Sequence, residues 1–194
     1  MELVLDLNKR YSYSDYLTWL DNKRRELIDG FIRMMSPAPH TIHAIVSENI
    51  DYLLSHYIRQ HKGKCRVFSA PFDVRLPVNG ESADKDIFTV VQPDICVVCD
   101  MSKIDYRGCL GAPDMIAEIL SPSTRRYDLV DKYNLYERSK VKEYWVIDPQ
   151  GKDVTVYLLQ DTGVYAEGII YEFDASVPVL SLSGLNIELK ELFD

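Results

Sequence analysis

The sequence lacks the features that mark several protein classes. No segment approaches the roughly 20 consecutive apolar residues of a membrane-spanning helix, and the N-terminus carries acids where a secretory signal would be basic. There is no glycine-rich phosphate loop and no Gly-x-Ser-x-Gly motif, so neither nucleotide hydrolysis nor serine-hydrolase chemistry is indicated. These absences predict a cytoplasmic protein with another chemistry.

Cysteine is scarce and follows no disulfide-framework spacing. Two of the four cysteines, Cys96 and Cys99, have the spacing of half a zinc site, but on a strand they would point to opposite faces. No second Cys or His pair completes such a site. We therefore predict no zinc or redox role, and we interpret both cysteines as small packing residues.

Basic residues are outnumbered by acidic ones. The chain has 30 Asp and Glu against 22 Lys and Arg, for a net charge of −8. This balance argues against a protein that coats nucleic acid nonspecifically, because Lys and Arg supply most of that affinity. An enzyme would need only a local basic rim. No linker-like stretch divides the 194 residues, so we expect a single domain over 1–194.

Hydrophobic periodicity predicts both helices and strands. We expect a short helix over 15–20, a β-hairpin around Asp29-Gly30, and a long amphipathic helix over 41–60 with Gly63 as its left-handed cap. Residues 79–90 are polar and predict a surface loop.

The remaining segments predict a core sheet and its covering helix. A helix should begin near Thr124 or Arg125 and end near Ser139, with Leu129, Tyr133 and Tyr136 facing inward. The predicted strands are 65–69, 71–76, 93–99, 114–120 and 143–148, followed by a hairpin of 154–159 and 164–173. The fold class is therefore mixed α/β, a mixed central sheet flanked by helices, with N-terminal and C-terminal β-hairpins.

Two acids stand in otherwise apolar strands. Asp94 opens one predicted strand after Gln92-Pro93, and Glu118 interrupts the apolar run 115–120 of the next. A buried acid is costly unless its charge is compensated. Two carboxylates on neighbouring strands could bind Mg²⁺, which prefers oxygen ligands, whereas an arginine or tyrosine partner would make Glu118 a structural acid.

Seven motifs resemble, in order and spacing, those of the Uma family of restriction endonucleases, a branch of the PD-(D/E)XK nuclease superfamily. They are ELIDG at 26–30, MMSPAPHTIH at 34–43, APFDVRL at 70–76, QPDI at 92–95, GAPDMIAEILSPST at 111–124, DKYNLYE at 131–137 and VKEYWVIDP at 141–149. The resemblance implies a restriction-endonuclease-like core of four strands between two helices. It also implies cleavage of nucleic acid, DNA in the first instance, that depends on Mg²⁺ or Mn²⁺.

The resemblance assigns Asp94 and Glu118 to the two acidic positions of the superfamily pattern, as metal ligands. The third position departs from the pattern, because Leu120 stands where a lysine is expected. Lys132, at the border of the inward stripe of the following helix, is the candidate replacement. From spacing alone, Lys132 could equally be a surface lysine paired with Asp128 at i,i+4.

Further residues are candidates of second rank. Glu26 and His43 match positions that the family pattern retains and could shape the water shell of the metal, although Glu26 can also be an exposed strand acid and His43 a hydrogen-bonded core histidine. Gln92 could similarly contact the substrate or a metal-bound water. Arg125 and Arg126 begin the helix after the Glu118 strand, where they could contact a nucleic-acid backbone.

The sequence supports two functional hypotheses. The first is a metal-dependent endonuclease in which Asp94 and Glu118 bind the ion and Lys132 assists the attacking water. The second is a catalytically silent descendant that serves as a binding or assembly module, suggested by the acidic charge and the missing lysine at Leu120. By analogy, a homodimer with paired sites would suit double-strand cleavage.

Overall fold

The computed structural model describes residues 4–21, 23–35, 40–121 and 125–194, and its main sheet has six strands. Only β9 and β10 pair in parallel, and the other neighbours are antiparallel. Both are buried along their whole length, which explains their largely apolar sequences. The order across this main sheet is β12 (Ile169–Tyr171), β11 (Asp153–Leu158), β10 (Glu143–Asp148), β9 (Met115–Ile119), β6 (Ile95–Val98) and β3 (Arg66–Ser69).

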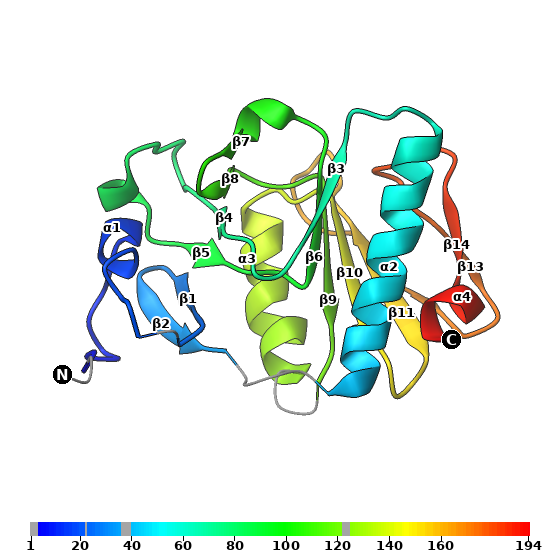
Figure 1. Ribbon diagram of the computed structural model, residues 1–194, viewed down its shortest axis with the longest axis horizontal. Helices are drawn as coiled ribbons and strands as arrows, with labels where there is room; N and C mark the ends of the chain where they lie inside the picture. Colours follow the sequence, from blue (N-terminus) through cyan, green and yellow to red (C-terminus); the bar gives the residue numbers. More distant parts are fainter. Residues whose placement is uncertain (1–3, 22, 36–39, 122–124) are drawn as a thin grey trace.

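Helices cover both faces of the main sheet. In Figure 1 the strands β6, β9 and β10 stand between α3 (Tyr133–Arg138) on one side and α2 (Thr41–Gln60) on the other. The α2 face is completed by the C-terminal elements β13 (Ser176–Pro178), β14 (Asn186–Glu188) and α4 (Leu189–Phe193), and its core is apolar. This arrangement confirms the predicted mixed α/β fold with helices on the faces of a mixed sheet.

A second six-stranded sheet packs beside the first near the N-terminus (Figure 1). Its order is β2 (Phe31–Met34), β1 (Arg25–Ile28), β5 (Val90–Val91), β4 (Val74–Arg75), β8 (Gly108–Leu110) and β7 (Ile104–Asp105). Three short helical segments flank it, namely α1 (Tyr13–Tyr16), η1 (Asp84–Asp86) and η2 (Met101–Lys103).

The second sheet corrects two predictions. The segment 71–76 was expected in the core sheet, but it supplies β4, which pairs with β5 and β8 instead. The polar stretch 79–90 is not wholly a surface loop, because Ile87 is fully buried and Val90 belongs to β5. Local periodicity identifies a strand but not its pairing partner, which is a non-local choice.

The N-terminal hairpin and the long helix agree with the sequence. Strands β1 and β2 pair around Asp29-Gly30, and α2 spans the predicted 41–60. The predicted cap is wrong, because Lys62 and not Gly63 has the left-handed φ, at 52°. The predicted helix over 15–20 is also shifted. Ser12 and Asp15 form a reciprocal capping box that starts α1 at Tyr13, and the helix ends at Tyr16.

The interpretation of Cys99 as a packing residue is wrong. Cys99 forms a disulfide with Cys65. Strands β3 and β6 pair antiparallel with Arg66 opposite Val98, and one further step of this register places Cys65 opposite Cys99. Cys96 and Cys109 are free and buried, as packing residues are. Across the described ranges, the structure has no helix long and apolar enough to cross a membrane.

The helix after β9 is helical throughout its described part but not uniform. Arg125 and Arg126 are α-helical, Tyr127–Lys132 form a π-helix labelled η3, and α3 follows. Thr124, a predicted start, lies outside the described residues. The predicted inward stripe is confirmed, because Tyr136 is buried and Leu129 and Tyr133 pack against the same apolar cluster. The buried positions of this helix are Asp128, Lys132, Leu135 and Tyr136. Two of these four side chains are charged.

Candidate active site

The two predicted acids lie at the same end of the main sheet. Strand β6 pairs with β9 so that Ile95 faces Ala117, and one further step of this register brings Asp94 opposite Glu118. Directly opposed residues of an antiparallel pair have Cβ atoms about 5 Å apart. Both acids line the same cavity, and Glu118 is only 3% exposed. The structure therefore brings the two acids together on one face.

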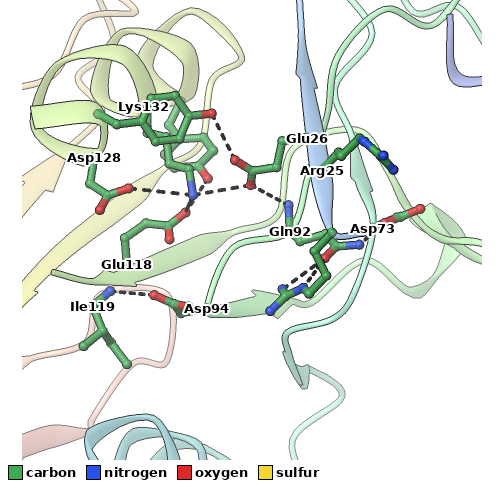
Figure 2. A network of polar contacts seen from close by, with 12 residues as sticks. Arg25, Glu26, Asp73, Gln92, Asp94, Glu118, Ile119, Asp128 and Lys132 are labelled. Carbon is green, nitrogen blue, oxygen red and sulfur yellow. Dashed lines mark hydrogen bonds and ion pairs between the residues drawn. The ribbon is translucent and has the colours of Figure 1, made fainter. Parts of the chain in front are cut away.

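Lys132 reaches this pair from the π-helix. Its Nζ donates to Glu118 Oε1 at 2.8 Å, and it lies 3.4 Å from Glu26 Oε1 and 3.8 Å from Asp128 Oδ1. Figure 2 shows the ammonium group between these three carboxylates. The side chain is 5% exposed, so Lys132 is not a surface lysine, although Asp128 is indeed one of its partners.

The π-helical geometry of η3 explains a contact that α-helical spacing does not. Backbone bonds in a π-helix join residues five apart, which brings such residues above one another. Tyr127 and Lys132 are separated by five, and the ammonium lies 5.4 Å from the centre of the Tyr127 ring. The Tyr127 hydroxyl donates to Glu26 Oε2 at 3.0 Å. η3 therefore supplies both the central cation and a residue that holds one of the surrounding acids.

Burial dominates the electrostatics of Glu118. It raises the pKa of this carboxyl to about 8, despite the opposing effect of Lys132 and with further contributions from Asp94 and Asp128. Tyr136 also donates to Glu118 Oε1, at 2.6 Å. For Lys132, burial opposes the charged form, but Glu118, Glu26 and Asp128 together raise its pKa well above the ordinary value. The single ammonium group of Lys132 therefore lies among three carboxylates, those of Glu26, Glu118 and Asp128.

Asp94 is held differently. Its Oδ2 accepts from the backbone amide of Ile119 at 2.8 Å and lies 3.2 Å from His43 Nε2. Burial disfavours the ionised form, but His43, Lys132 and the Ile119 amide lower the pKa of Asp94 below its ordinary range. The same contact, against the effect of burial, raises the pKa of His43. Asp94 is thus an ionised carboxylate beside a histidine that readily carries charge.

Glu26 lies beside Lys132, and the backbone of Gln92 holds it there. Glu26, on β1, is 2% exposed and accepts from the Gln92 backbone amide at 2.9 Å. The Gln92 side chain points away from the acids, because its amide is engaged by Arg24, Asp73 and Tyr16. Gln92 therefore positions Glu26 with its backbone, while its side chain joins the N-terminal sheet to α1.

The two arginines predicted to contact nucleic acid do not line the cavity. Arg125 forms an ion pair with Asp148 at 2.5 Å, and Arg126 is exposed. The cavity instead contains Arg24 and Arg59, neither of which the sequence singled out. The sequence places Arg59 on the outer side of the long helix. That position indicates a functional role only once the structure shows that the helix lies beside the acids.

The cavity has a volume of about 1050 Å³ and extends well beyond the acids. One side is a continuous face of α2 from His40 to Arg59, and the other includes Arg24, Glu26 and the end of β2. Over the described ranges, no group of three or more His, Cys, Asp and Glu side chains is arranged as a metal site. Any cation here would have to rely on fewer protein ligands.

Comparison with known proteins agrees with this fold. The Uma2 family model, described as "Putative restriction endonuclease", matches residues 13–190, which confirms the resemblance found in the motifs. An uncharacterised protein of Synechocystis sp. is 25% identical over 170 residues, covering 86% of this chain and 82% of that protein. The crystal structure of "a putative nuclease belonging to DUF820" from Anabaena variabilis is similar with a TM-score of 0.72 and 25% identity, covering 94% of this chain and 97% of the other.

Proposed function

Because this chain belongs to the Uma2 family of restriction-endonuclease-like proteins, we propose that it is an endonuclease that hydrolyses DNA phosphodiester bonds with Mg²⁺ or Mn²⁺. The observation that carries the proposal is the convergence of Asp94, Glu118 and Lys132 at one end of a large cavity. The nuclease class follows from the family and the fold. The metal, the DNA substrate and the roles of individual residues are the proposal.

The donor set fits a hard divalent cation. Among the described residues, the hydrogen bonds to Asp94 go to Oδ2 and those to Glu118 go to Oε1, so Oδ1 and Oε2 are left for an ion. Mg²⁺ is commonly bound through one or two carboxylates, with water and substrate phosphate completing its shell. Glu26 and Glu118 are both buried and both lie against the ammonium group of Lys132, and this pairing of two acids with one cation further favours a bound ion. When bound, such an ion would supply positive charge at the scissile phosphate.

The protein residues would then divide the remaining tasks. Asp94 and Glu118 would hold the ion. Lys132 would orient the attacking water and stabilise the negative charge that develops on the phosphate. His43 would fix the direction of Asp94, and Glu26 that of Lys132, as outer partners of a metal site commonly do. Tyr136 would hold Glu118 Oε1 on the side away from the ion.

The experiment is a cleavage assay with a matched control, an acid that lies just before the strand that carries Glu118. Wild type, Glu118→Gln and Asp114→Asn are purified identically and incubated with plasmid, linear duplex and single-stranded DNA in Mg²⁺ or Mn²⁺. We expect cleavage by wild type and Asp114→Asn, and a loss of more than about 100-fold in Glu118→Gln, because a metal ligand is removed. Equal cleavage by wild type and Glu118→Gln would remove Glu118 from the site.

The alternative is a nuclease fold that binds nucleic acid or a partner without cutting. It is favoured by Glu118 having both Lys132 and Tyr136 as partners, which satisfies this acid without any ion. A ligand that binds only the native state raises its melting temperature. If millimolar Mn²⁺ raises the melting temperature of neither wild type nor Glu118→Gln, and no DNA is cleaved, the alternative holds.

Three further assignments complete the proposal. We propose that residues 1–194 form one domain, since one apolar cluster joins buried side chains of the N-terminal sheet, such as Val74 and Val91, to those of the main sheet, such as Cys96 and Ile116. We propose a cytoplasmic location. We also propose a homodimer, the commonest closed assembly of soluble proteins. Analytical ultracentrifugation of the purified protein tests the dimer.

A further inference from the structure

The cavity continues far beyond the three proposed catalytic residues, along helix α2. Its lining includes short, half-buried side chains such as Ser47 and Ser55, which we take as its floor, and the exposed Tyr52, His56 and Arg59, which we take as its rim. We call this part the α2 groove. It begins at His43, which contacts Asp94, and it is therefore continuous with the proposed active site.

The rim of the α2 groove carries an aromatic pair that the core does not use. Tyr52 is 62% exposed, and its ring stacks on that of His56 with centroids 5.4 Å apart and an interplanar angle of 27°. A single exposed aromatic residue is ordinary on a protein surface. Here the stacked pair lies in the cavity that also contains Glu118 and Lys132. Such a pair is a platform on which a nucleic-acid base can stack.

The charges of the cavity favour single-stranded over double-stranded nucleic acid. Carboxylates outnumber Lys and Arg among its lining residues, and the cations outside the acid cluster are Arg24 and Arg59. A duplex presents two phosphate backbones and is bound mainly by neutralising them. A single strand can instead turn its bases to aromatic side chains and keep its phosphates near solvent. The exposed Met34 adds an apolar surface within the same cavity.

We propose that the α2 groove binds a single nucleic-acid strand with unpaired bases, one of which stacks on Tyr52. This inference rests on the proposed function, because it assumes that the strand continues to Asp94 and Glu118. It defines the substrate class as single-stranded or locally unpaired nucleic acid, such as a loop, an overhang or a frayed end. Arg59 then contacts the backbone where the strand leaves the groove.

The helix sets the spacing between the stacked base and the cleaved bond. Tyr52 is nine residues beyond His43, or about 14 Å along the helix axis. That distance corresponds to about four nucleotides of a stacked strand at 3.4 Å each. Substrates with fewer than about four unpaired nucleotides beside the cleaved bond therefore cannot reach Tyr52, and they are cut more slowly.

Binding without cleavage tests the groove by itself. Fluorescence polarisation in EDTA is measured with labelled oligothymidylate, oligouridylate and a DNA duplex, each about 12 nucleotides long. We expect wild type to bind at least one of the single strands more tightly than the duplex, and the two strands distinguish DNA from RNA. Tyr52→Ala should weaken that binding about tenfold, as the loss of one base stack does, whereas Tyr52→Phe should retain it.

Matched controls keep the test decisive. Tyr106→Ala removes a fully exposed tyrosine outside this cavity and should change nothing. His56→Ala removes the other ring of the pair and should weaken binding of the same strand. Equal affinity of wild type for strand and duplex overturns the inference, as does unchanged binding in Tyr52→Ala or no binding of either strand.

The two proposals fail in different ways. If wild type cleaves DNA but Tyr52→Ala binds and cleaves single strands as wild type does, the groove is wrong and the nuclease stands. If strand binding depends on Tyr52 but no divalent cation supports cleavage, the groove stands and the nuclease is wrong. The Tyr52 variants should fold, since Tyr52 is largely exposed. Circular dichroism checks that they do.

Discussion

The two ends of strand β9 carry the same kind of ion pair in different surroundings. Just before the strand begins, Asp114 accepts from Lys142 at 2.7 Å. Near its end, Glu118 accepts from Lys132 at 2.8 Å. The lysine side chain is 71% exposed in the first pair and 5% exposed in the second. Of these four residues, only Glu118 and Lys132 line the large cavity.

Burial reverses the direction of the pKa shift between these two acids. At Asp114, burial raises the pKa, but Lys142 and the backbone amide of Cys99 lower it more, so the net shift is downward. At Glu118, burial is stronger than the attraction of Lys132, and the pKa rises to about 8. Contact distance therefore does not distinguish a structural pair from a candidate catalytic one. The loss of solvent does.

The largest effect should follow truncation of the buried lysine. Lys132→Ala leaves Glu118, Glu26 and Asp128 without their shared cation, which should cost about 3–5 kcal/mol of unfolding free energy. Urea denaturation followed by circular dichroism measures it. A cost no greater than that of Lys142→Ala would contradict the difference drawn between the two pairs.

A double variant separates charge from packing in the same experiment. Lys132→Met keeps most of the volume of the side chain but leaves the acids uncompensated. Adding Glu118→Gln neutralises one of these acids and still offers Tyr136 an acceptor. The double variant should therefore be more stable than Lys132→Met alone while remaining inactive in cleavage.

A pH-dependent effect should come next in size. The folded-state pKa of Glu118 lies above its ordinary value of 4.5, so the folded state holds this proton more tightly than the unfolded chain does. The resulting stability is fully present below about pH 4.5 and is lost as the pH rises through about 8. In EDTA, the melting temperature of wild type should therefore fall relative to that of Glu118→Gln between pH 5 and pH 9.

The raised pKa of Lys132 does not obscure that comparison. Its contribution is present below the ordinary lysine value of 10.5 and is lost only at higher pH, outside the window. If the difference in melting temperature between wild type and Glu118→Gln stays constant from pH 5 to pH 9, Glu118 is ionised throughout this range.

The smallest effect should be at the exposed pair. Lys142→Ala should cost no more than about 1 kcal/mol, because solvent screens the pair and Asp114 keeps its bond from the Cys99 amide. The effect should shrink further in high salt, whereas that of Lys132→Ala should not. Similar salt dependence of the two variants, measured by urea denaturation, would mean that solvent reaches both pairs.

The sequence by itself determined the local elements and the two acids. Periodicity and turn residues were enough for the hairpin around Asp29-Gly30 and for α2, because such signals depend on neighbours in the chain. An acid inside an apolar strand needs a partner for its charge, which made Glu118 a candidate. Asp94 could be identified at the start of the preceding apolar strand. Spacing alone left Lys132 undecided between a buried and a surface position.

Only the tertiary structure decided which of these elements meet. The register of β3 and β6 joins Cys65 to Cys99, and the π-helix places Tyr127 beside Lys132. The α2 groove likewise exists only because one face of α2 lies beside the acids. Strand pairing, helix irregularity and burial of charge depend on contacts between residues far apart in the chain, and no local pattern encodes them.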